Sequence, residues 1–130
     1  MYDRKNSSKY LLMYHLIFVC KYRKKLLLRL GNDIEKIFYD ISNISNFSIL
    51  KMKTDSNHIH LIVKSEPNIS ISQIVRRLKQ LSTNDIWKKE YLYLQKHFWR
   101  RNIFWSNGYF VCSIENVSMK TVEKYIEEQG

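Results

Sequence analysis

The chain lacks several features that mark other classes of protein. Its 130 residues include only two cysteines, Cys20 and Cys112, which lie far apart in separate apolar stretches. This placement is typical of buried core thiols and not of a disulfide framework or a zinc knuckle. No apolar run approaches the roughly 20 residues of a membrane span, and the polar residues 1–6 do not resemble a signal peptide. The sequence therefore predicts a protein of the reducing cytoplasm with no membrane partner.

Acidic residues are scarce relative to basic ones. The chain has 22 Lys and Arg against 12 Asp and Glu, which gives a formal net charge of +10. A surplus this large favours a polyanionic partner such as nucleic acid, although a merely soluble basic protein can carry it too. No repeat, low-complexity segment or linker interrupts the chain, and 45% of its residues are hydrophobic. We therefore expect a single domain over residues 1–130.

Two of the four histidines lie two residues apart in the apolar run 57–64. Side chains of a β-strand alternate between faces, so His58 and His60 would share one face. The other face would be buried and apolar, and it comprises Ile59, Leu61 and Val63. The two imidazoles, roughly 7 Å apart at their Cα atoms, can reach one ion, because neutral imidazole is the commonest metal ligand. Histidines on a solvated strand also occur without a metal, so the motif alone leaves both interpretations open.

Apolar periodicity predicts the order strand, helix, strand, strand, helix, strand and a final helix. Three of the predicted strands span residues 10–22, 47–53 and 109–114. The remaining one, third in the chain, begins at His58 and ends before Pro67. The predicted helices span residues 32–45 (capped by Asn32 or Asp33), a segment opened by Ser70 or Ser72, and 117–129 (capped by Ser118). The turn-forming residues 54–57 would join the two middle strands in a hairpin.

This order predicts an α+β fold. The first six elements match the split βαβ, or ferredoxin-like, βαββαβ pattern, whose four-stranded antiparallel sheet carries both helices on one face. The other face would stay open, and His58 and His60 would line it. The extra C-terminal helix carries Tyr125 and Gln129 four residues apart, and therefore on one helical face. Taken alone, such a tyrosine packs against its own domain and such a glutamine contacts water.

In their order along the chain, these segments resemble the single-tyrosine HUH transposases of the insertion-sequence-200/605 family. The resemblance covers nearly the whole chain. It is carried by YHLIFV (14–19), KYR (21–23), NHIHL (57–61), Pro67, LKQLS (78–82), FWSNGYFV (104–111), VS (117–118) and YIEEQ (125–129). The NHIHL segment contains the His-hydrophobic-His motif itself. The ordered series is far more specific than any one of its segments.

The resemblance implies an enzyme that cleaves and rejoins single-stranded DNA at hairpin-bearing element ends. Tyr125 on the C-terminal helix would be the catalytic nucleophile, and it would form a 5′-phosphotyrosine link and release a 3′-OH. His58, His60 and Gln129 would hold Mg²⁺ or Mn²⁺, which would polarise the scissile phosphate. Two imidazoles and an amide oxygen form a neutral, borderline ligand set that suits Mn²⁺ at least as well as Mg²⁺.

The resemblance also implies a homodimer in which the tyrosine helix of one subunit completes the active site of the other. Basic residues are candidates for contacts with the DNA backbone, and they are Lys21, Arg23, Arg76, Arg77, Lys79, Arg100 and Arg101. Each could equally be an ordinary solvated side chain. Aromatic residues within 97–109 are candidates for stacking on unpaired bases.

Three other functions fit parts of the sequence. A non-catalytic ferredoxin-like module could bind single-stranded nucleic acid, but this would leave the histidine pair and its match with Tyr125 and Gln129 unexplained. A domesticated relative could nick DNA at hairpin repeats without mobilising an element, and only its genomic surroundings would distinguish it. A replication-initiation nickase of the wider superfamily is disfavoured, because the sequence shows no helicase domain or long extension.

Overall fold

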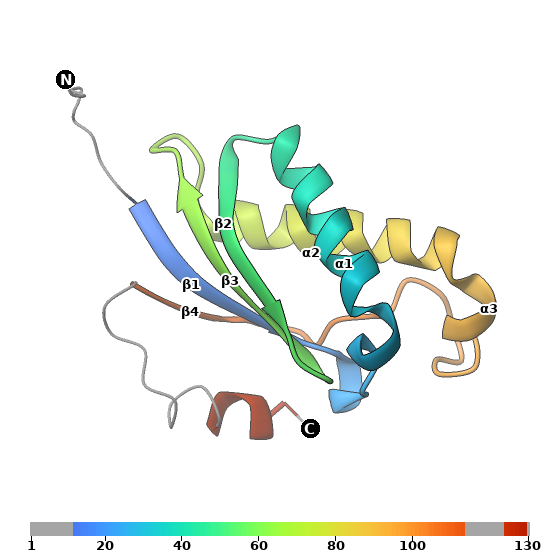
Figure 1. Cartoon of the computed structure of the whole chain (residues 1–130). Helices are drawn as coiled ribbons and strands as arrows, with labels where there is room; N and C mark the ends of the chain where they lie inside the picture. Colours follow the sequence, from blue (N-terminus) through green and yellow to red (C-terminus); the bar gives the residue numbers. More distant parts are fainter. Residues whose placement is uncertain (1–11, 114–123, 130) are drawn as a thin grey trace.

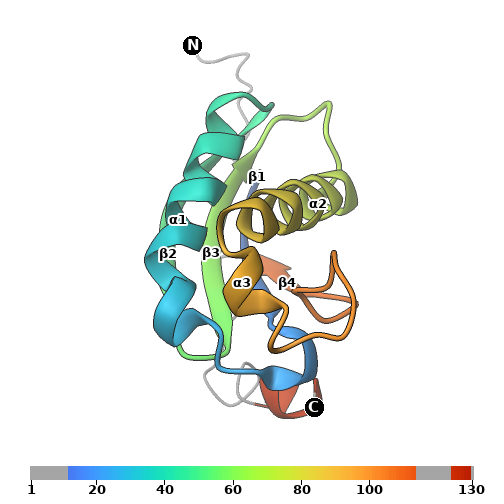
Figure 2. The same ribbon diagram turned by 90° about the vertical axis from the view of Figure 1, so that its right-hand side faces the viewer.

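Four strands form one antiparallel sheet in the computed structural model, which describes residues 12–113 and 124–129. They are β1 (Leu12–Val19), β2 (Phe47–Thr54), β3 (His58–Ser65) and β4 (Phe110–Ser113), in the sheet order β2-β3-β1-β4. Helices α1 (Leu27–Asn43) and α2 (Ile71–Lys89) cover one face of this sheet (Figures 1 and 2). Two short helices are η1 (Lys21–Arg23) and α3 (Tyr91–Leu94). The predicted α+β fold, with a four-stranded antiparallel sheet and two helices on one face, is confirmed.

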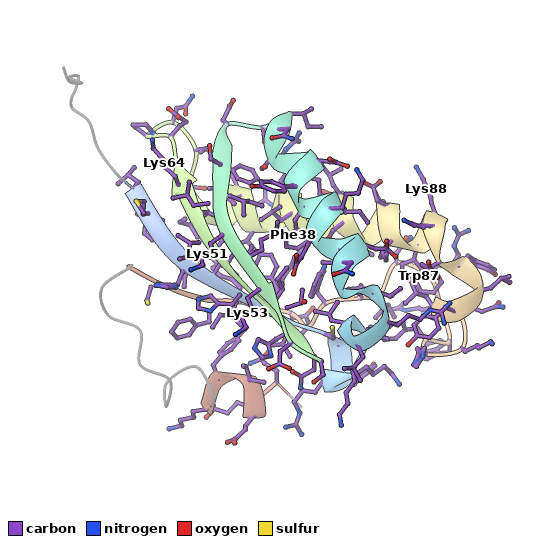
Figure 3. All side chains as sticks on the ribbon, viewed as in Figure 1. Phe38, Lys51, Lys53, Lys64, Trp87 and Lys88 are labelled. Carbon is purple, nitrogen blue, oxygen red and sulfur yellow. The ribbon has the colours of Figure 1, made fainter. Side chains whose placement is uncertain are left out.

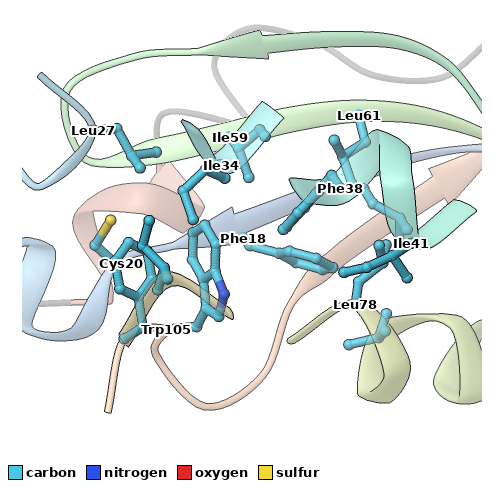
Figure 4. Close-up of a cluster of buried hydrophobic side chains, with 14 of the residues drawn as sticks. Phe18, Cys20, Leu27, Ile34, Phe38, Ile41, Ile59, Leu61, Leu78 and Trp105 are labelled. Carbon is cyan, nitrogen blue, oxygen red and sulfur yellow. The ribbon is translucent and has the colours of Figure 1, made fainter. Parts of the chain in front are cut away.

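The core fills the space between the sheet and the two long helices. Its members are buried, and those from β1, β3, α1 and α2 include Leu16, Ile59, Leu61, Val63, Ile34, Ile41 and Leu78 (Figure 4). Three aromatic rings meet at its centre. The ring centroid of Phe18 lies 5.9 Å from that of Phe38 and 5.8 Å from that of Trp105. Such tilted and edge-on contacts contribute about 0.5–1.5 kcal/mol each beyond the burial of area.

Local sequence signals set the hairpin and the start of α2. β2 and β3 pair across a turn of residues 55–57, where the Asp55 backbone N–H donates to His58 O at 2.9 Å. Ser70 Oγ accepts a hydrogen bond from the Gln73 N–H, and Gln73 Oε1 accepts one from the Ser70 N–H. This reciprocal arrangement is a capping box, which satisfies amide donors that a helix end leaves open. The predicted hairpin and the predicted Ser70 cap are both confirmed.

The predicted start of the first helix is wrong. α1 begins at Leu27 and not near Asn32 or Asp33, and its N-cap residue, Leu26, has no side-chain oxygen to cap it. Leu26, Leu27 and Leu30 are all buried in the core. The helix extends to them because their packing outweighs the missing cap, and packing supplies most helical stability in proteins. The first strand is correspondingly shorter than predicted, since it ends at Val19 and η1 follows at Lys21.

The two cysteines differ in their surroundings. Cys20 is fully buried, and this burial raises the pKa of its thiol to about 12. Cys112 lies on the edge strand β4 and is only partly buried. The prediction of a core thiol is therefore right for Cys20 and wrong for Cys112.

The final helix falls largely outside the described residues. Of the predicted span 117–129, residues 124–129 are described, and 124–127 of these are helical. The predicted cap Ser118 lies outside the described part. Within residues 12–113 and 124–129, no helix combines the length and the apolar character needed to cross a bilayer.

Phe38 tests the core directly. Phe38→Ala should lower the free energy of unfolding by about 3–5 kcal/mol, because it removes a fully buried ring and leaves a cavity. Urea denaturation would measure the change. Tyr39→Ala is the matched control, since Tyr39 is 53% exposed and surface changes usually stay within about 0.5 kcal/mol. Equal losses for the two variants would contradict this description of the core.

Candidate active site and nucleic-acid cleft

The register of the sheet places His58 and His60 on the face away from the helices. Val19 of β1 lies opposite His58, and Ile17 lies opposite His60. Directly opposed residues of an antiparallel pair point to the same face. Ile17 and Val19 belong to an apolar cluster separate from the main core. Both histidines are partly buried, while Ile59 between them is fully buried, so the predicted alternation along β3 is confirmed.

A neighbouring side chain engages one ring nitrogen of each histidine. His58 Nδ1 donates to Asn57 Oδ1 at 2.9 Å, and His60 Nε2 lies 2.7 Å from Nδ1 of His15 on β1. Among the described residues, no hydrogen bond engages the other nitrogens, His58 Nε2 and His60 Nδ1. Burial lowers the pKa of both rings, and the nearby His15 and His58 lower that of His60 further. Both rings are therefore biased toward the neutral form, which is the form that binds metals.

The C-terminal turn, residues 124–129, packs over the same face of the sheet (Figure 1). Tyr125 and Ile126 contact the cluster of Ile17 and Val19, which are the cross-strand partners of the two histidines. The Tyr125 ring centroid lies 5.6 Å from that of Phe110 on β4. Partial burial here raises the pKa of the Tyr125 phenol. The fold therefore brings Tyr125 onto the strand positions that adjoin the histidines.

Two ring nitrogens on this face have the donor chemistry that divalent metals bind. His58 Nε2 and His60 Nδ1 are imidazole nitrogens without hydrogen-bond partners among the described residues. Gln129, the predicted third ligand, is partly buried in the C-terminal turn, where its backbone N–H donates to Ile126 O at 3.1 Å. In the described part of the chain, no three His, Cys, Asp or Glu side chains gather around one point. An ion here would need an amide, water or substrate oxygens beside the two imidazoles.

Three lysines that are not among the predicted DNA contacts lie on β2 and β3. Lys53 lies opposite His60, Lys51 lies two residues earlier on β2, and Lys64 lies on β3 (Figure 3). A register shift between Ile49 and Lys51 sets this arrangement, as β-bulges do. The period-two spacing of Lys51 and Lys53 was the available signal. Of the three, Lys53 lies directly across from His60, and Lys51 lies across from Ile62.

A cleft of about 880 Å³ opens between α2, η1 and residues 99–108. The basic and aromatic residues that line it include Lys21, Tyr22, Arg76, Lys79, Trp99, Arg100, Phe104 and Trp105. The Trp99 side chain is 86% exposed, and the Arg100 guanidinium lies 5.5 Å from its ring centroid. None of the described residues lining the cleft is acidic. Cations and an exposed indole are groups that bind phosphates and stack on unpaired bases.

The end of β1 connects this cleft to the histidines. Lys21 in the cleft wall follows Val19, the partner of His58, by two residues. Backbone hydrogen bonds fasten the opposite wall to the same strand end, since Lys21 N donates to Phe104 O at 2.8 Å and Ser106 N donates to Val19 O at 2.7 Å. In both Figure 1 and Figure 2, η1 and the C-terminal turn lie at the same end of the molecule.

The predicted DNA contacts fall into two groups. Four of them line the cleft, namely Lys21, Arg76, Lys79 and Arg100, while Arg23, Arg77 and Arg101 do not. Lys79 Nζ donates to the backbone carbonyls of Ser106, at 2.8 Å, and Gly108. Burial, with a smaller effect of Lys21, lowers the pKa of Lys79 to about 8. Arg77 Nε donates to Ser45 Oγ at 2.6 Å, so it links α2 to the end of α1.

Comparison with known proteins identifies the family. Residues 8–129 match the family model described as "Transposase IS200 like". The chain belongs to the IS200-like transposase family. The ISDra2 transposase TnpA of Deinococcus radiodurans is 28% identical to it over 121 residues, which cover 92% of this chain and 85% of that protein. The transposase for insertion sequence element IS200 of Salmonella typhimurium is 26% identical over 117 residues, which cover 89% of this chain and 75% of that protein.

Solved structures agree with this assignment. A putative transposase from Deinococcus radiodurans superposes on this IS200-like transposase with a TM-score of 0.83 and 25% identity, and 92% of each chain is covered. A REP-associated tyrosine transposase bound to a REP hairpin superposes with a TM-score of 0.58 and 15% identity, covering 92% of this chain and 66% of that one. The second likeness shows the fold alone. The family is one of DNA-binding enzymes of transposition, as the sequence predicted.

The depressed pKa values of the histidines predict how the stability of this IS200-like transposase depends on pH. The unfolded chain binds protons to His58 and His60 near their ordinary pKa of 6.5, while the folded chain binds them only at lower pH. Stability should therefore be greatest above 6.5 and fall as the pH drops toward the folded-state values. Urea denaturation across this window would measure the slope. The double variant His58→Gln with His60→Gln should give a flatter profile, and an unchanged slope would contradict the assignment.

Proposed function

We propose that this IS200-like transposase cleaves and rejoins single-stranded DNA at hairpin-bearing ends through a covalent 5′-phosphotyrosine, with the help of a divalent metal. One observation carries the proposal: Tyr125 packs on Ile17 and Val19, which are the direct cross-strand partners of His60 and His58. The proposed nucleophile and the two proposed metal ligands therefore belong to one small area of the open face. A module that only bound nucleic acid would not need this combination.

Tyr125 supplies the nucleophilic oxygen in this proposal. Its Oη attacks the scissile phosphorus, a new P–O bond to tyrosine forms, and the P–O3′ bond breaks. The phenolic proton passes to the departing oxygen, which becomes a free 3′-OH. Since a phosphodiester-level bond is kept, another 3′-OH can reverse the step and join a new strand. Because burial raises the pKa of the phenol above its ordinary value of 10, the phenol is protonated at neutral pH and requires activation.

His58, His60 and Gln129 are the proposed metal-holding residues. Bound Mg²⁺ or Mn²⁺ would supply positive charge that polarises the scissile phosphate and offsets charge developing on its oxygens. The protein side of the site is neutral, because both rings are biased toward their uncharged forms and the third group is an amide. Lys53, opposite His60, adds a fixed cation that attracts the DNA backbone.

The cleft is the proposed binding surface for the DNA that leads to this site. It is lined by cations and by the exposed Trp99, and Lys21 at its wall is two residues from the partner of His58. A strand held in the cleft could therefore pass around the end of β1 to the open face. A hairpin-bearing ligand is supported by the structural neighbour that is bound to a REP hairpin. Phosphate contacts would position the strand and stacking would retain its unpaired bases.

We further propose a homodimer with exchanged tyrosine helices. The C-terminal turn is held on the open face through a small cluster of Ile17, Val19 and Phe110, separate from the main core. The same turn of a second copy could occupy this cluster without disturbing the core. Exchange of identical elements is a low-cost route to such dimers.

A covalent adduct tests the proposed chemistry. Single-stranded hairpin DNA from the flanks of the encoding gene, labelled at its 3′ end, would be incubated with the protein and Mn²⁺ and run on a denaturing gel. The label should move to the protein band, because Tyr125 retains the strand downstream of the break. Tyr125→Phe should abolish the adduct, and chelator should abolish it for the wild type.

Tyr39→Phe is the matched control, since Tyr39 is an exposed tyrosine on α1, and it should form the adduct normally. Persistence of the adduct in Tyr125→Phe would show that another residue is the nucleophile. If no flanking hairpin gives an adduct with wild-type protein, the non-catalytic binding function is favoured instead.

The cleft is tested by equilibrium binding in the Tyr125→Phe background, where no reaction interferes. Trp99→Ala should weaken hairpin binding by about 1–3 kcal/mol through the loss of one stacked base. Arg76→Ala should make the slope of log K against log salt concentration less steep by about 1, the change expected for the loss of one phosphate contact. Lys88→Ala is the control, since Lys88 is exposed at the end of α2 (Figure 3) and is absent from the cleft lining. Equal effects of Arg76→Ala and Lys88→Ala would remove the cleft from the proposal.

A further inference from the structure

His15 on β1 contacts a proposed metal ligand directly. Its Nδ1 lies 2.7 Å from His60 Nε2, and the two ring centroids are 4.9 Å apart with planes inclined by 40°. His15 lies two residues before Ile17, the partner of His60, so strand alternation puts it on the same open face. It is partly buried, as are His58 and His60.

A nitrogen–nitrogen contact this short holds one proton, so one ring donates and the other accepts. If His15 donates, the lone pair of His60 Nε2 is used, and neutral His60 carries its own proton on Nδ1. Neither nitrogen of His60 is then available to an ion. If His60 donates from Nε2, its Nδ1 carries a lone pair, and no hydrogen bond among the described residues engages that atom. Only this second arrangement lets His60 bind a metal while His15 stays in place.

We propose that His15 is a positioning residue whose Nδ1 accepts a hydrogen bond from His60 Nε2–H, and that it thereby presents His60 Nδ1 to the metal. Asn57 has the corresponding role for His58, because its Oδ1 accepts a hydrogen bond from His58 Nδ1–H and leaves His58 Nε2 available to the metal. Each proposed ligand thus has an acceptor that fixes its tautomer and its ring orientation. Such outer partners typically affect metal affinity 10–100-fold. The inference rests on the metal chemistry of the proposed function.

Binding of Mn²⁺ alone, followed by electron paramagnetic resonance, measures the role without any DNA. His15→Phe keeps a ring of similar size but removes the acceptor, and it should weaken Mn²⁺ binding about 10–100-fold. His15→Asn should bind Mn²⁺ within a few-fold of wild type, because the Asn Oδ1 can accept the hydrogen bond from His60 near the position of Nδ1. His97→Phe is the control, since the His97 ring packs on Tyr93 of α3, with the two ring centroids 4.7 Å apart. This variant should bind Mn²⁺ like wild type.

The tautomer of His60 provides a second readout that a purely structural role would not change. In the metal-free protein at mildly alkaline pH, long-range ¹⁵N–¹H correlation spectra should show His60 protonated at Nε2. In His15→Phe, the ring should lose this fixed preference, while thermal unfolding establishes that the variant remains folded. A wild-type His60 protonated at Nδ1 would overturn the proposal.

The two hypotheses can fail separately. Mn²⁺ affinity that is unchanged or tighter in His15→Phe overturns the role of His15, even where wild-type protein forms the covalent DNA adduct. Absence of any Mn²⁺ binding by wild type overturns it as well. Weaker Mn²⁺ binding in His15→Phe, rescued in His15→Asn, supports the role of His15 even if no DNA adduct forms, and in that case only the proposed strand transfer fails.

Discussion

The antiparallel register between β1 and β3 is the constraint on which the rest of the structure depends. It aligns Phe18 with Ile59 on the helix face, and Ile17 with His60 on the open face. A slip of one residue would exchange the faces, placing His60 in the core and Leu61 outside. Fully burying one large aliphatic or aromatic side chain is worth about 1.5–3 kcal/mol, so the buried set opposes such a slip strongly. The packing of the core therefore determines where the histidines point.

The same register separates the two chemical environments of the sheet. The helix face is closed by α1 and α2, and the residues that fill it are almost all apolar. The open face carries histidines, lysines and the small cluster that holds Tyr125. Lys79 on α2 is a partly buried cation, and the backbone carbonyls of Ser106 and Gly108 offset the cost of its burial by accepting hydrogen bonds from its Nζ. Its contribution to the cleft is therefore to hold residues 106–108 in place as much as to attract phosphate.

Period-two and capping signals made much of the fold predictable from the sequence. The alternation of His58–Ser65 and the cap at Ser70 are local patterns that tertiary packing reinforced. The start of α1 was not predictable in this way, since Leu27 begins the helix without a capping side chain and only long-range burial explains it. Local rules fail where a contact between distant segments decides the outcome.

In the candidate site, too, some features follow from local sequence patterns and others from contacts between distant segments. The histidine pair is visible in the sequence, but the contact of His15 with His60 joins residues 45 apart and depends on strand pairing. The sequence predicts Arg77 as a DNA contact, yet in the structure its guanidinium donates hydrogen bonds to Ser45 Oγ and to the carbonyl of Ile44. Neither contact can be predicted from a local sequence pattern. The His15–His60 contact depends on the register of the sheet, and the Arg77 contacts depend on the packing of α1 on α2.

The central claim is that Tyr125 and the two histidines act on one phosphate. The most direct measurement is mass spectrometry of the Mn²⁺-dependent DNA adduct after digestion with nuclease and trypsin. Cleavage after Lys124 releases a peptide that begins at Tyr125, and this peptide should carry the added nucleotide on its tyrosine. Replacement of both His58 and His60 should remove the modified peptide. A nucleotide on any other peptide, or an unchanged yield without the two histidines, would contradict the account.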